Sequence, residues 1–343
     1  MSTDPPRRAP LRRAGISAPT LDVVAGLAKV SPATVSRFLN NPGVVAEKSA
    51  RRIREAIAET GYVPNLLAGG LASNRSRLVA LIVPSVSQSI FNDTIDAIVD
   101  ALSRAGYTAM LGLSGEDDTR LSSVVDAAIA RRPDGIIITS AGTAMMRERL
   151  MQSGITIIET WDLPDSPLDI AVGFSHRAVG HAIGEFLIAH GYRRPLVISA
   201  SGARARARYQ GIVEALETRG RPAPRVDYLG GTTRFGEGRR RLASALDSGD
   251  PPDLVICSSD WLAQGVIVEA LSRGISVPGE LAVIGFGNLG FAADMEPPIT
   301  SVHVHGEQIG SEAVAALLRR AAGEDVQPIV DVGFSIVERG STR

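Results

Sequence analysis

Three arginines at alternate positions, Arg204, Arg206 and Arg208, have the side-chain chemistry that binds a small anion. They stand in a loop that we expect to enter a helix at Tyr209–Arg219. A guanidinium group can donate two parallel hydrogen bonds to a carboxylate, and a helix N-terminus favours negative charge. The three residues therefore predict a carboxylate site, and surface charges in a solvated loop are the alternative.

A glycine pattern typical of dinucleotide-binding enzymes occurs at Gly285-Phe286-Gly287-Asn288-Leu289-Gly290. Such a site also needs a βαβ unit and an acidic ribose ligand about 20 residues later. Here Met295-Glu296-Pro297-Pro298 interrupts the expected helix, and His303-Val304-His305 occupies the ribose-ligand region. The nucleophile motif GxSxG does not occur either. The sequence therefore predicts a protein that is not an enzyme.

Candidate metal ligands are few, since the chain has five histidines and one cysteine. His303 and His305 would lie on one face of a strand, but no third ligand accompanies them. Cys257 follows the apolar run Leu254-Val255-Ile256 and is expected to be a buried thiol. We therefore expect no metal and no cofactor.

The composition predicts a globular protein of more than one compact unit. At 343 residues the chain exceeds what one hydrophobic core usually supports, and 44% of its residues are apolar and 21% charged. No stretch approaches the roughly 18 consecutive apolar residues of a membrane span. The pairs Arg7-Arg8 and Arg12-Arg13 are not followed by the apolar core of an export signal. We expect a cytoplasmic protein without membrane contact.

Charge is divided unevenly along the chain. Residues 1–77 contain 12 Lys and Arg against 5 Asp and Glu, a net charge of +7, and the remaining 24 against 32 give −8. A small basic part on a large acidic body is typical of a nucleic-acid-binding head joined to a domain with another task. A solute-binding protein without DNA function would explain the body but not this head.

Residues 20–63 carry the pattern of three short helices. Ser31 and Pro32 give a start signal, because serine caps a helix N-terminus and proline fits its first turn. Gly61 is the expected stop of the last helix. Residues 1–19, rich in proline and arginine, are expected to form a disordered basic tail. The helices are predicted at Leu21–Ala28, Pro32–Leu39 and Glu47–Thr60.

After a hinge segment at residues 64–77, short apolar runs alternate with amphipathic stretches over residues 78–343. The runs are rich in β-branched residues, which is typical of buried parallel strands, and the alternation predicts a doubly wound α/β architecture. Because this is more chain than one sheet normally uses, we expect two lobes with a cleft between them. Strands are predicted at Leu78–Val83, Gly135–Ile138, Leu196–Ile198, Leu254–Ile256 and Leu281–Ile284.

Three segments of the head resemble the lactose-repressor family. Thr20-Leu21-Asp22-Val23-Val24-Ala25 and Val30–Asn40 are similar to its helix-turn-helix, and Gly61-Tyr62-Val63-Pro64-Asn65 to the segment that opens its hinge. The α/β remainder is similar to the family's effector domain, which resembles periplasmic sugar-binding proteins. The resemblance implies a repressor that binds a near-palindromic operator in double-stranded DNA. Because no heptad tail follows Arg339, a homodimer is favoured over a tetramer.

The resemblance assigns DNA contacts to the second helix, which lies in the major groove. Pro32, Ala33 and Arg37 occupy its base-reading positions, and Arg37 can pair with guanine O6 and N7. A phosphate contact or a surface charge is the alternative for Arg37. Phosphate contacts are expected from Thr34, Ser36 and Asn40, and Ser31 completes the DNA-contacting set. The core of the head is expected to include Val23, Val35 and Phe38.

Leu71 aligns with the family leucine that wedges into the minor groove at the operator centre. Burying an apolar side chain between base steps kinks the duplex. Gly69-Gly70 lowers the stability of the hinge helix by about 1 kcal/mol per glycine relative to alanine. We therefore expect a hinge that is disordered off DNA.

Within the family, the sequence is most similar to gluconate-operon repressors. The similarity lies in Leu168–Phe174, Met295-Glu296-Pro297 and Asp331–Phe334. It implies a sugar acid such as gluconate or a keto-derivative as effector, and a neutral sugar is the alternative. Gly287 replaces an aspartate found in many relatives, which removes repulsion against an anion. Arg208 is the best match to the family's ligand-binding arginine.

The remaining expected effector contacts are placed by the same resemblance. Phe91 and Trp161 either cover the apolar face of a sugar or pack in the core. Thr233 stands where purine-binding relatives have a stacking aromatic, which argues against a nucleobase. Asp260 either binds ligand hydroxyls or caps the helix that starts near Trp261. Further cleft candidates are Ser85, Ser87, Asn92, Ser175, His176, Arg234 and Ser259.

Overall fold

The structure is a computed structural model that describes residues 19–64, 76–87, 89–115, 118–140, 142–230 and 233–342. The chain divides into two compact units, Met1–Asn74 and Arg75–Arg343, and each is described by itself. Nearly all of the predicted tail and most of the predicted hinge, including Leu71, lie outside the described residues. Within the described ranges no helix has the length and apolar character needed to span a bilayer.

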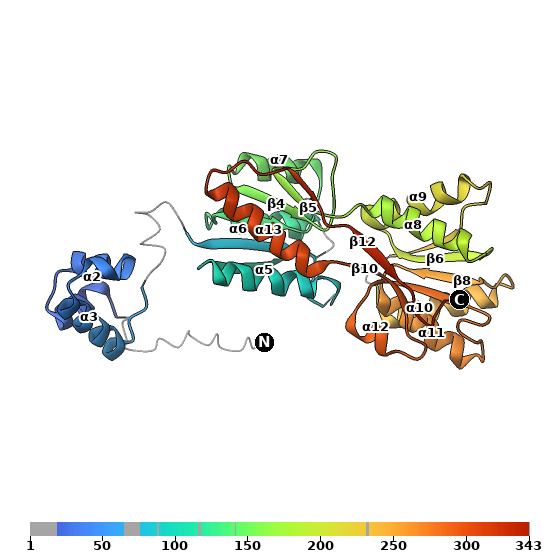
Figure 1. Ribbon diagram of the computed structural model, residues 1–343, viewed down its shortest axis with the longest axis horizontal. Helices are drawn as coiled ribbons and strands as arrows, with labels where there is room; N and C mark the ends of the chain where they lie inside the picture. The colour runs from blue at the N-terminus through green and yellow to red at the C-terminus, as the bar shows by residue number, and fades with distance from the viewer. Residues whose placement is uncertain are drawn as a thin grey trace, which may run out of the picture. The chain divides into compact units, whose positions relative to one another are not determined.

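The described part of the first unit consists of three α-helices and one 3-10 turn (Figure 1). The predicted bounds of the first and third helices are confirmed, and the second runs one residue further than predicted. The elements are α1 (Leu21–Ala28), α2 (Pro32–Asn40), η1 (Pro42–Val44) and α3 (Glu47–Thr60).

Both predicted signals at the helix ends are confirmed. The Ser31 Oγ accepts a hydrogen bond from the Thr34 amide at 3.2 Å, and Pro32 occupies the first turn of α2. Gly61 closes α3 with a φ of 65°, a left-handed conformation that glycine adopts without steric cost. These ends fix where α2 begins, and therefore which of its residues face outward.

The core of this unit differs from the prediction at one residue. Val35 and Phe38 are buried as predicted, but Val23 is 47% exposed and Val24 is fully buried in its place. Each residue advances a helix by about 100°, so one of two neighbouring valines must leave the buried face. Val24 shares that face with Ala28, which is also buried.

The first lobe of the second unit is built on six parallel strands in the described residues. They are β1 (Leu78–Val83), β2 (Thr108–Leu113), β3 (Gly135–Ile138), β4 (Thr156–Thr160), β5 (Ile170–Gly173) and β11 (Ile329–Asp331). Their order across the sheet is β11-β5-β4-β3-β1-β2. The predicted bounds of β1 and β3 are confirmed, because continuous apolar runs suit strands covered on both faces.

The second lobe has a sheet of the same size in the described residues. Its strands are β6 (Pro195–Ala200), β7 (Arg225–Leu229), β8 (Leu254–Cys257), β9 (Ala282–Gly287), β10 (Thr300–Val304) and β12 (Phe334–Val337). Their order is β12-β10-β9-β8-β6-β7, and β12 runs antiparallel to β10 while the other pairs are parallel. The two sheets confirm the predicted two-lobed α/β body.

Helices cover both faces of the first sheet, as alternate residues of β1 show. Val79 and Leu81 pack with α5 (Asn92–Arg104) and α13 (Gly306–Ala321), whereas Ala80 and Ile82 pack on the other face. That other face is covered by α6 (Asp118–Ile129) and α7 (Ala144–Gln152). The helices of the second lobe are α8 (His176–Ala189), α9 (Ala203–Glu217), α10 (Phe235–Asp247), α11 (Asp260–Ser272) and α12 (Gly290–Asp294).

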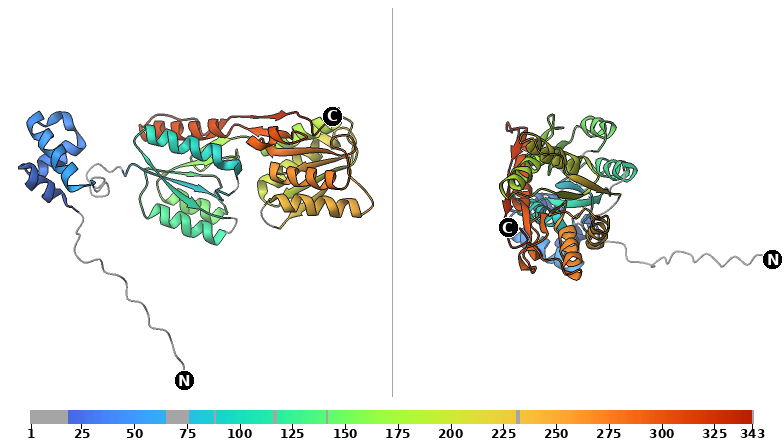
Figure 2. Two further views of the ribbon diagram at one scale, coloured as in Figure 1. Left: turned by 90° about the horizontal axis from the view of Figure 1, so that it is seen from below. Right: turned by 90° about the vertical axis from the view of Figure 1, so that its right-hand side faces the viewer.

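The chain passes between the lobes three times, from β5 to α8, from β10 to α13 and from β11 to β12 (Figures 1 and 2). Two of these crossovers are tied together, because the Val332 amide donates to the Gly173 carbonyl at 2.8 Å. Lobes joined through short segments of this kind are expected to open and close about them.

The three arginines predicted to lie in a loop are instead part of helix α9. This helix begins at Ala203, six residues before the predicted start, because alanine and arginine are strong helix formers. Residues two positions apart in a helix point in nearly opposite directions, whereas residues four apart share a face. Arg204 and Arg208 therefore share one face of α9, and Arg206 lies on the opposite face.

Glycines allow α8 and α9 to touch through their backbones. A Cβ atom at Gly180 would lie 1.9 Å from the Arg208 carbonyl oxygen, and one at Gly211 would lie 2.1 Å from the Arg177 carbonyl oxygen. Side chains at these positions would force the helices apart. The contact therefore fixes the backbone of Arg208 relative to the start of α8.

Gly180→Ala should destabilise the second unit by about 1–3 kcal/mol, the usual cost of overpacking a closely packed site. Urea unfolding followed by tryptophan fluorescence measures this unit alone, because both tryptophans, Trp161 and Trp261, lie in it. Gly290→Ala is the control, because a Cβ there would meet no atom within 4 Å. Equal unfolding midpoints for the two variants would contradict this account of the helix contact.

Candidate functional site

A cavity of about 500 Å³ lies between the two lobes of the second unit. Residues after β1 and β4 line it from the first lobe, and residues at or after the ends of β6, β7, β8 and β9 line it from the second lobe, together with His176 of α8. Since parallel strands present their carboxyl ends at one edge of a sheet, the two sheets contribute these ends to a common cleft. The lining residues are Ser87, Ile90, Phe91, Trp161, His176, Ala200, Gly202, Arg204, Ala205, Arg208, Thr233, Arg234, Phe235, Ser258, Ser259, Trp261, Phe286 and Leu289.

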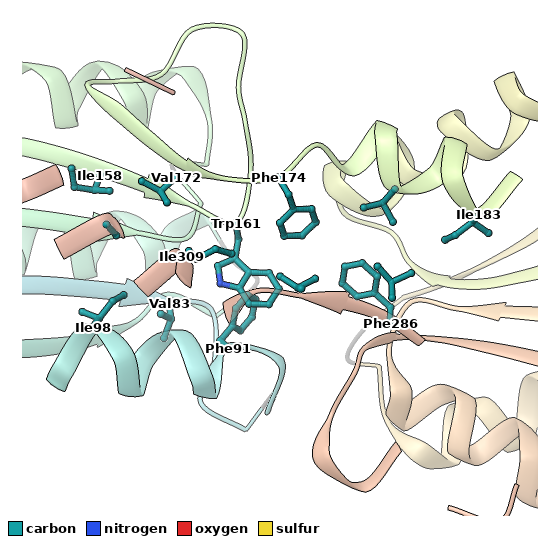
Figure 3. Close-up of a cluster of buried hydrophobic side chains, with 14 of the residues drawn as sticks. Val83, Phe91, Ile98, Ile158, Trp161, Val172, Phe174, Ile183, Phe286 and Ile309 are labelled. Atoms are coloured by element: carbon teal, nitrogen blue, oxygen red, sulfur yellow. The ribbon is translucent and has the colours of Figure 1, made fainter. Parts of the chain in front are cut away.

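Aromatic side chains from both lobes meet at this cavity (Figure 3). The rings of Phe91 and Trp161 pack edge to face, 4.8 Å between centroids, and Trp161 packs on Phe174 at 5.9 Å. Trp161 Nε1 donates to Thr94 Oγ1 at 3.0 Å, so its polar atom is already used. The sequence allowed either a core or a ligand-binding role for Phe91 and Trp161. In the structure both residues belong to the core cluster and also line the cavity.

Trp161 adopts an unusual backbone conformation directly after β4. Its φ is 69°, in the left-handed region that β-branched and bulky residues rarely occupy. The Trp161 amide donates to the Val172 carbonyl at 3.1 Å, and a Cβ at Gly173 would lie 2.5 Å from the Asp162 amide nitrogen. The close approach to Gly173 therefore holds the strained turn in place, a pattern typical of functional sites.

Arg208 brings a partly buried positive charge to the cavity. Its Nη1 donates to His176 Nδ1 at 2.9 Å, and its guanidinium carbon lies 4.2 Å from the centre of the Phe286 ring. Among the described residues no carboxylate forms an ion pair with Arg208. Burial, and then the nearby charge of Arg204, lower the pKa of Arg208 to about 10. The remaining guanidinium donors can bind an anion in the cavity.

His176 holds Arg208 in position from the start of α8. Its Nε2 lies 2.8 Å from the Trp161 carbonyl oxygen, and its Nδ1 faces Arg208. Because arginine only donates and a carbonyl only accepts, the imidazole must be neutral with its proton on Nε2. Burial, followed by the charges of Arg208 and Arg204, lowers the pKa of His176 well below 6.5.

The other two arginines of α9 have different partners. Arg206 does not line the cavity: its Nε donates to the Ser201 carbonyl at 3.0 Å and its guanidinium carbon lies 4.7 Å from the centre of the Tyr228 ring. Arg204 lines the cavity but bonds to groups of the first lobe, including Asp162. The two residues therefore do not share the environment of Arg208.

Two predicted effector residues, Asp260 and Gly287, do not line the cavity. The buried Asp260 carboxylate accepts from Ser301 Oγ at 2.6 Å and from the Leu289 amide at 2.7 Å, so it holds the loop after β9. Gly287 has a φ of 119°, and a Cβ there would lie 3.4 Å from Ile90 Cγ1 of the first lobe. It is a point where the two lobes approach each other.

The cavity thus brings together four of the six predicted effector residues, Phe91, Trp161, Arg208 and Thr233. Of the further candidates, Ser87, His176, Arg234 and Ser259 line it, whereas Ser85, Asn92 and Ser175 do not. Sequence reasoning missed several lining residues in turns and at helix starts, and Phe286 near the end of β9. The position of Phe286 at a strand end could have indicated it. The missed lining residues include Ile90, Phe235, Ser258, Trp261 and Phe286.

In the first unit, α2 presents its polar side chains to solvent. Ser31, Pro32, Ala33, Ser36, Arg37 and Asn40 are exposed, and Thr34 is partly buried. Within the described residues no hydrogen bond or ion pair engages the Arg37 guanidinium. By contrast, Arg54 of α3 pairs with Glu47 at 2.9 Å and lies over the Phe38 ring. Arg37 is therefore available for an external partner.

Comparison with known proteins finds a family match in each of the two units. "Bacterial regulatory proteins, lacI family" matches residues 20–65, and "Periplasmic binding protein-like domain" matches residues 185–342. The HTH-type transcriptional regulator GntR of Pseudomonas aeruginosa is 35% identical over 330 residues, which cover 94% of this chain and 96% of that protein. The chain belongs to the lacI family.

Further relatives support the assignment to the lacI family. The HTH-type transcriptional repressor CytR of Escherichia coli is 28% identical over 339 residues, covering 95% of this chain and 97% of that protein. A crystal structure of a LacI-family regulator from Silicibacter pomeroyi has a TM-score of 0.88 at 28% identity, covering 94% of this chain and 99% of that one. The lacI-family protein is therefore a DNA-binding transcriptional repressor and not an enzyme. Its glycine pattern at β9 leads into α12, a helix of only five residues.

The neutral state of His176 predicts a pH dependence of stability. Unfolded, this histidine takes up a proton near pH 6.5, but the folded protein resists protonation until well below that value. The contribution of His176 to the free energy of unfolding is therefore constant above pH 6.5 and falls below it, by up to about 1.4 kcal/mol per pH unit. Urea unfolding between pH 5 and 8 measures this slope.

His176→Asn should reduce the slope, because asparagine can accept from Arg208 without titrating. His181→Asn is the control on the same helix, since His181 is exposed. The assignment of a neutral His176 fails when parent and His176→Asn lose stability equally below pH 6.5.

Proposed function

We propose that this repressor is controlled by a sugar acid, such as gluconate or a keto-derivative, bound in the cavity between the lobes. The observation that carries the proposal is the partly buried Arg208 guanidinium, which has no carboxylate ion-pair partner among the described residues and faces the cavity. A ligand carboxylate would supply the missing negative charge through charge-assisted hydrogen bonds.

The rest of the lining suits a polyol. Aromatic rings such as Phe91 and Trp161 offer faces to the C–H groups of a sugar chain. Hydroxyls of Ser87, Thr233 and Ser258 line the cavity. Ser87 already bonds the Ser85 hydroxyl and Ser258 already accepts from the Ala200 amide, but a hydroxyl can both donate and accept, so each would pair with a ligand hydroxyl as well. The sequence similarity to gluconate-operon repressors and the relative named GntR support the same ligand class. A neutral sugar is the second candidate, since the aromatic wall by itself would bind one.

For DNA binding we propose a homodimer on a near-palindromic operator, in the cytoplasm. Arg37 would read a guanine in each half-site, because it is exposed on α2 and unpaired within the described residues. Thr34, Ser36 and Asn40 would contact phosphates. Leu71, which lies outside the described residues, remains the proposed minor-groove wedge.

Arg37→Ala should weaken binding to the preferred operator by about 1–3 kcal/mol per contact and flatten the preference at one base pair of each half-site. The operator is first selected from a random DNA pool with the parent protein, and affinities are then measured for every base at each position. Arg51→Ala, on the exposed side of α3, is the control and should leave the base preference intact. Undiminished preference in Arg37→Ala would exclude base reading by Arg37.

Arg208→Gln should weaken binding of gluconate by about 10- to 150-fold, because a charge-assisted hydrogen bond contributes roughly 1.5–3 kcal/mol. Titration calorimetry with gluconate, 2-ketogluconate, glucose and ribose measures this loss. Arg206→Gln is the matched control on the opposite face of α9 and should bind as the parent does. Tighter binding of a neutral sugar than of either acid by the parent protein would overturn the sugar-acid proposal and leave the repressor function intact.

A further inference from the structure

Arg204 connects the two lobes across the cavity. It belongs to α9 of the second lobe, and its guanidinium donates to three groups of the first lobe. Its Nε lies 3.3 Å from Asp162 Oδ2, and its Nη2 lies 3.1 Å from the Thr160 carbonyl oxygen and also bonds the Thr139 carbonyl oxygen. One side chain therefore makes three polar contacts between the lobes, which are also joined by the short crossovers and by the hydrogen bond between His176 of α8 and the Trp161 carbonyl.

The acceptors of Arg204 follow from the topology of the first sheet. Thr139 directly follows β3, Thr160 ends β4, and these two strands are parallel neighbours. The carbonyls at the carboxyl ends of neighbouring strands lie at the end of the ladder, where no further strand amide donates to them. A planar guanidinium, with five donors in a fixed fork, can bond both carbonyls and a carboxylate at once.

Charge separates the role of Arg204 from that of Arg208. Asp162 of the first lobe forms an ion pair with Arg204, so the charge of this arginine already has a negative partner. Arg208, one turn later on the same face of α9, has an imidazole and a phenyl ring as neighbours instead. An anion entering the cavity would therefore pair with Arg208 and leave the bonds of Arg204 unbroken.

Two further contacts between the lobes accompany those of Arg204. His176, at the start of α8, makes a single hydrogen bond with the Trp161 carbonyl oxygen at 2.8 Å. Ile90 of the first lobe lies against Gly287 of the second, where a Cβ would meet it at 3.4 Å. This contact is apolar and weak, because it involves one side chain and a glycine. The directional bonds of Arg204 are therefore better suited to set the angle between the lobes.

We infer that Arg204 is a latch that holds the lobes closed around the cavity, and that it supports binding of any ligand there whatever the ligand's charge. It acts as a positioning residue, whereas Arg208 would discriminate acids from neutral sugars. The ligand part of this inference rests on the proposed function, but the closure of the lobes does not.

Distance measurements between the lobes test the latch without any ligand. Spin labels are attached in full-length protein at Met145→Cys on α7, where the parent side chain is 72% exposed, and at Glu217→Cys, an exposed residue of α9. Cys257→Ser removes the chain's one natural cysteine. Labelled chains are diluted with unlabelled ones so that pulsed dipolar spectroscopy reports distances within a chain.

Arg204→Ala should broaden the distance distribution and shift it to longer distances, and Arg206→Ala should leave it unchanged. Arg204→Lys should behave like Arg204→Ala, because an ammonium group cannot reach two carbonyls and a carboxylate together. The same distribution in parent and Arg204→Ala would overturn the latch.

Calorimetry with gluconate and glucose tests the consequence for binding. Arg204→Ala should weaken both ligands by a similar factor, about 10-fold for the loss of one charge-assisted interaction, whereas Arg208→Gln should weaken the acid selectively. Loss of gluconate binding alone, with recovery in Arg204→Lys, would show that Arg204 serves as a cavity charge and would overturn the inference. Failure of gluconate to bind the parent would count against the proposed function, and the interlobe distances would still decide the latch.

Discussion

The cavity is organised around the positive charge of Arg208, which the protein partly buries without an ion pair to a carboxylate among the described residues. A buried guanidinium is costly unless its donors are satisfied. Phe286 offers a ring face to Arg208, and neutral His176 accepts one of its hydrogen bonds, but neither supplies negative charge. In the proposed function, a ligand carboxylate would complete the interactions of Arg208.

The backbone around this charge is held with little freedom. Gly180 and Gly211 let α8 and α9 approach until main-chain atoms touch, so Arg208 and His176 cannot drift apart. In the first lobe, Gly173 allows the backbone of Asp162 to approach closely and so holds the strained turn at Trp161. The Trp161 carbonyl in turn fixes the tautomer of His176. Close backbone contacts in both lobes thus hold the two ends of one hydrogen-bonded chain, which runs from the Trp161 carbonyl through His176 to Arg208.

This arrangement suggests how binding in the body reaches the DNA-binding head. The lobes meet through crossovers, the bonds of Arg204, the hydrogen bond of His176 with the Trp161 carbonyl and the contact of Ile90 with Gly287. A ligand that favours one angle between the lobes by about 1–3 kcal/mol is sufficient for allosteric control. We propose that this bias acts on the hinge segment, where the sequence Gly69-Gly70 predicts a helix of low stability.

Local chemistry in the sequence was enough to predict elements whose formation depends on neighbouring residues. Ser31-Pro32 and Gly61 set helix ends correctly, and continuous apolar runs gave the bounds of β1 and β3. The helix-turn-helix and its exposed Arg37 also followed from adjacent residues. The same reasoning failed at Val23, where two neighbouring valines compete for one buried face, and at α9, where the Ala-Arg run was taken for a loop.

The partners of the cavity residues depended on contacts distant in sequence, and the tertiary structure alone decided them. Asp260 has the chemistry of a ligand residue, but Ser301 and the Leu289 amide occupy its carboxylate. Arg204 and Arg208 are indistinguishable as residue types, and only the first reaches Asp162. The sequence by itself determined the family, the helix-turn-helix and the two-lobed body, because periodicity and end signals are local. The partners of each charged side chain were decided by folding, because they are the groups that packing brings within bonding distance.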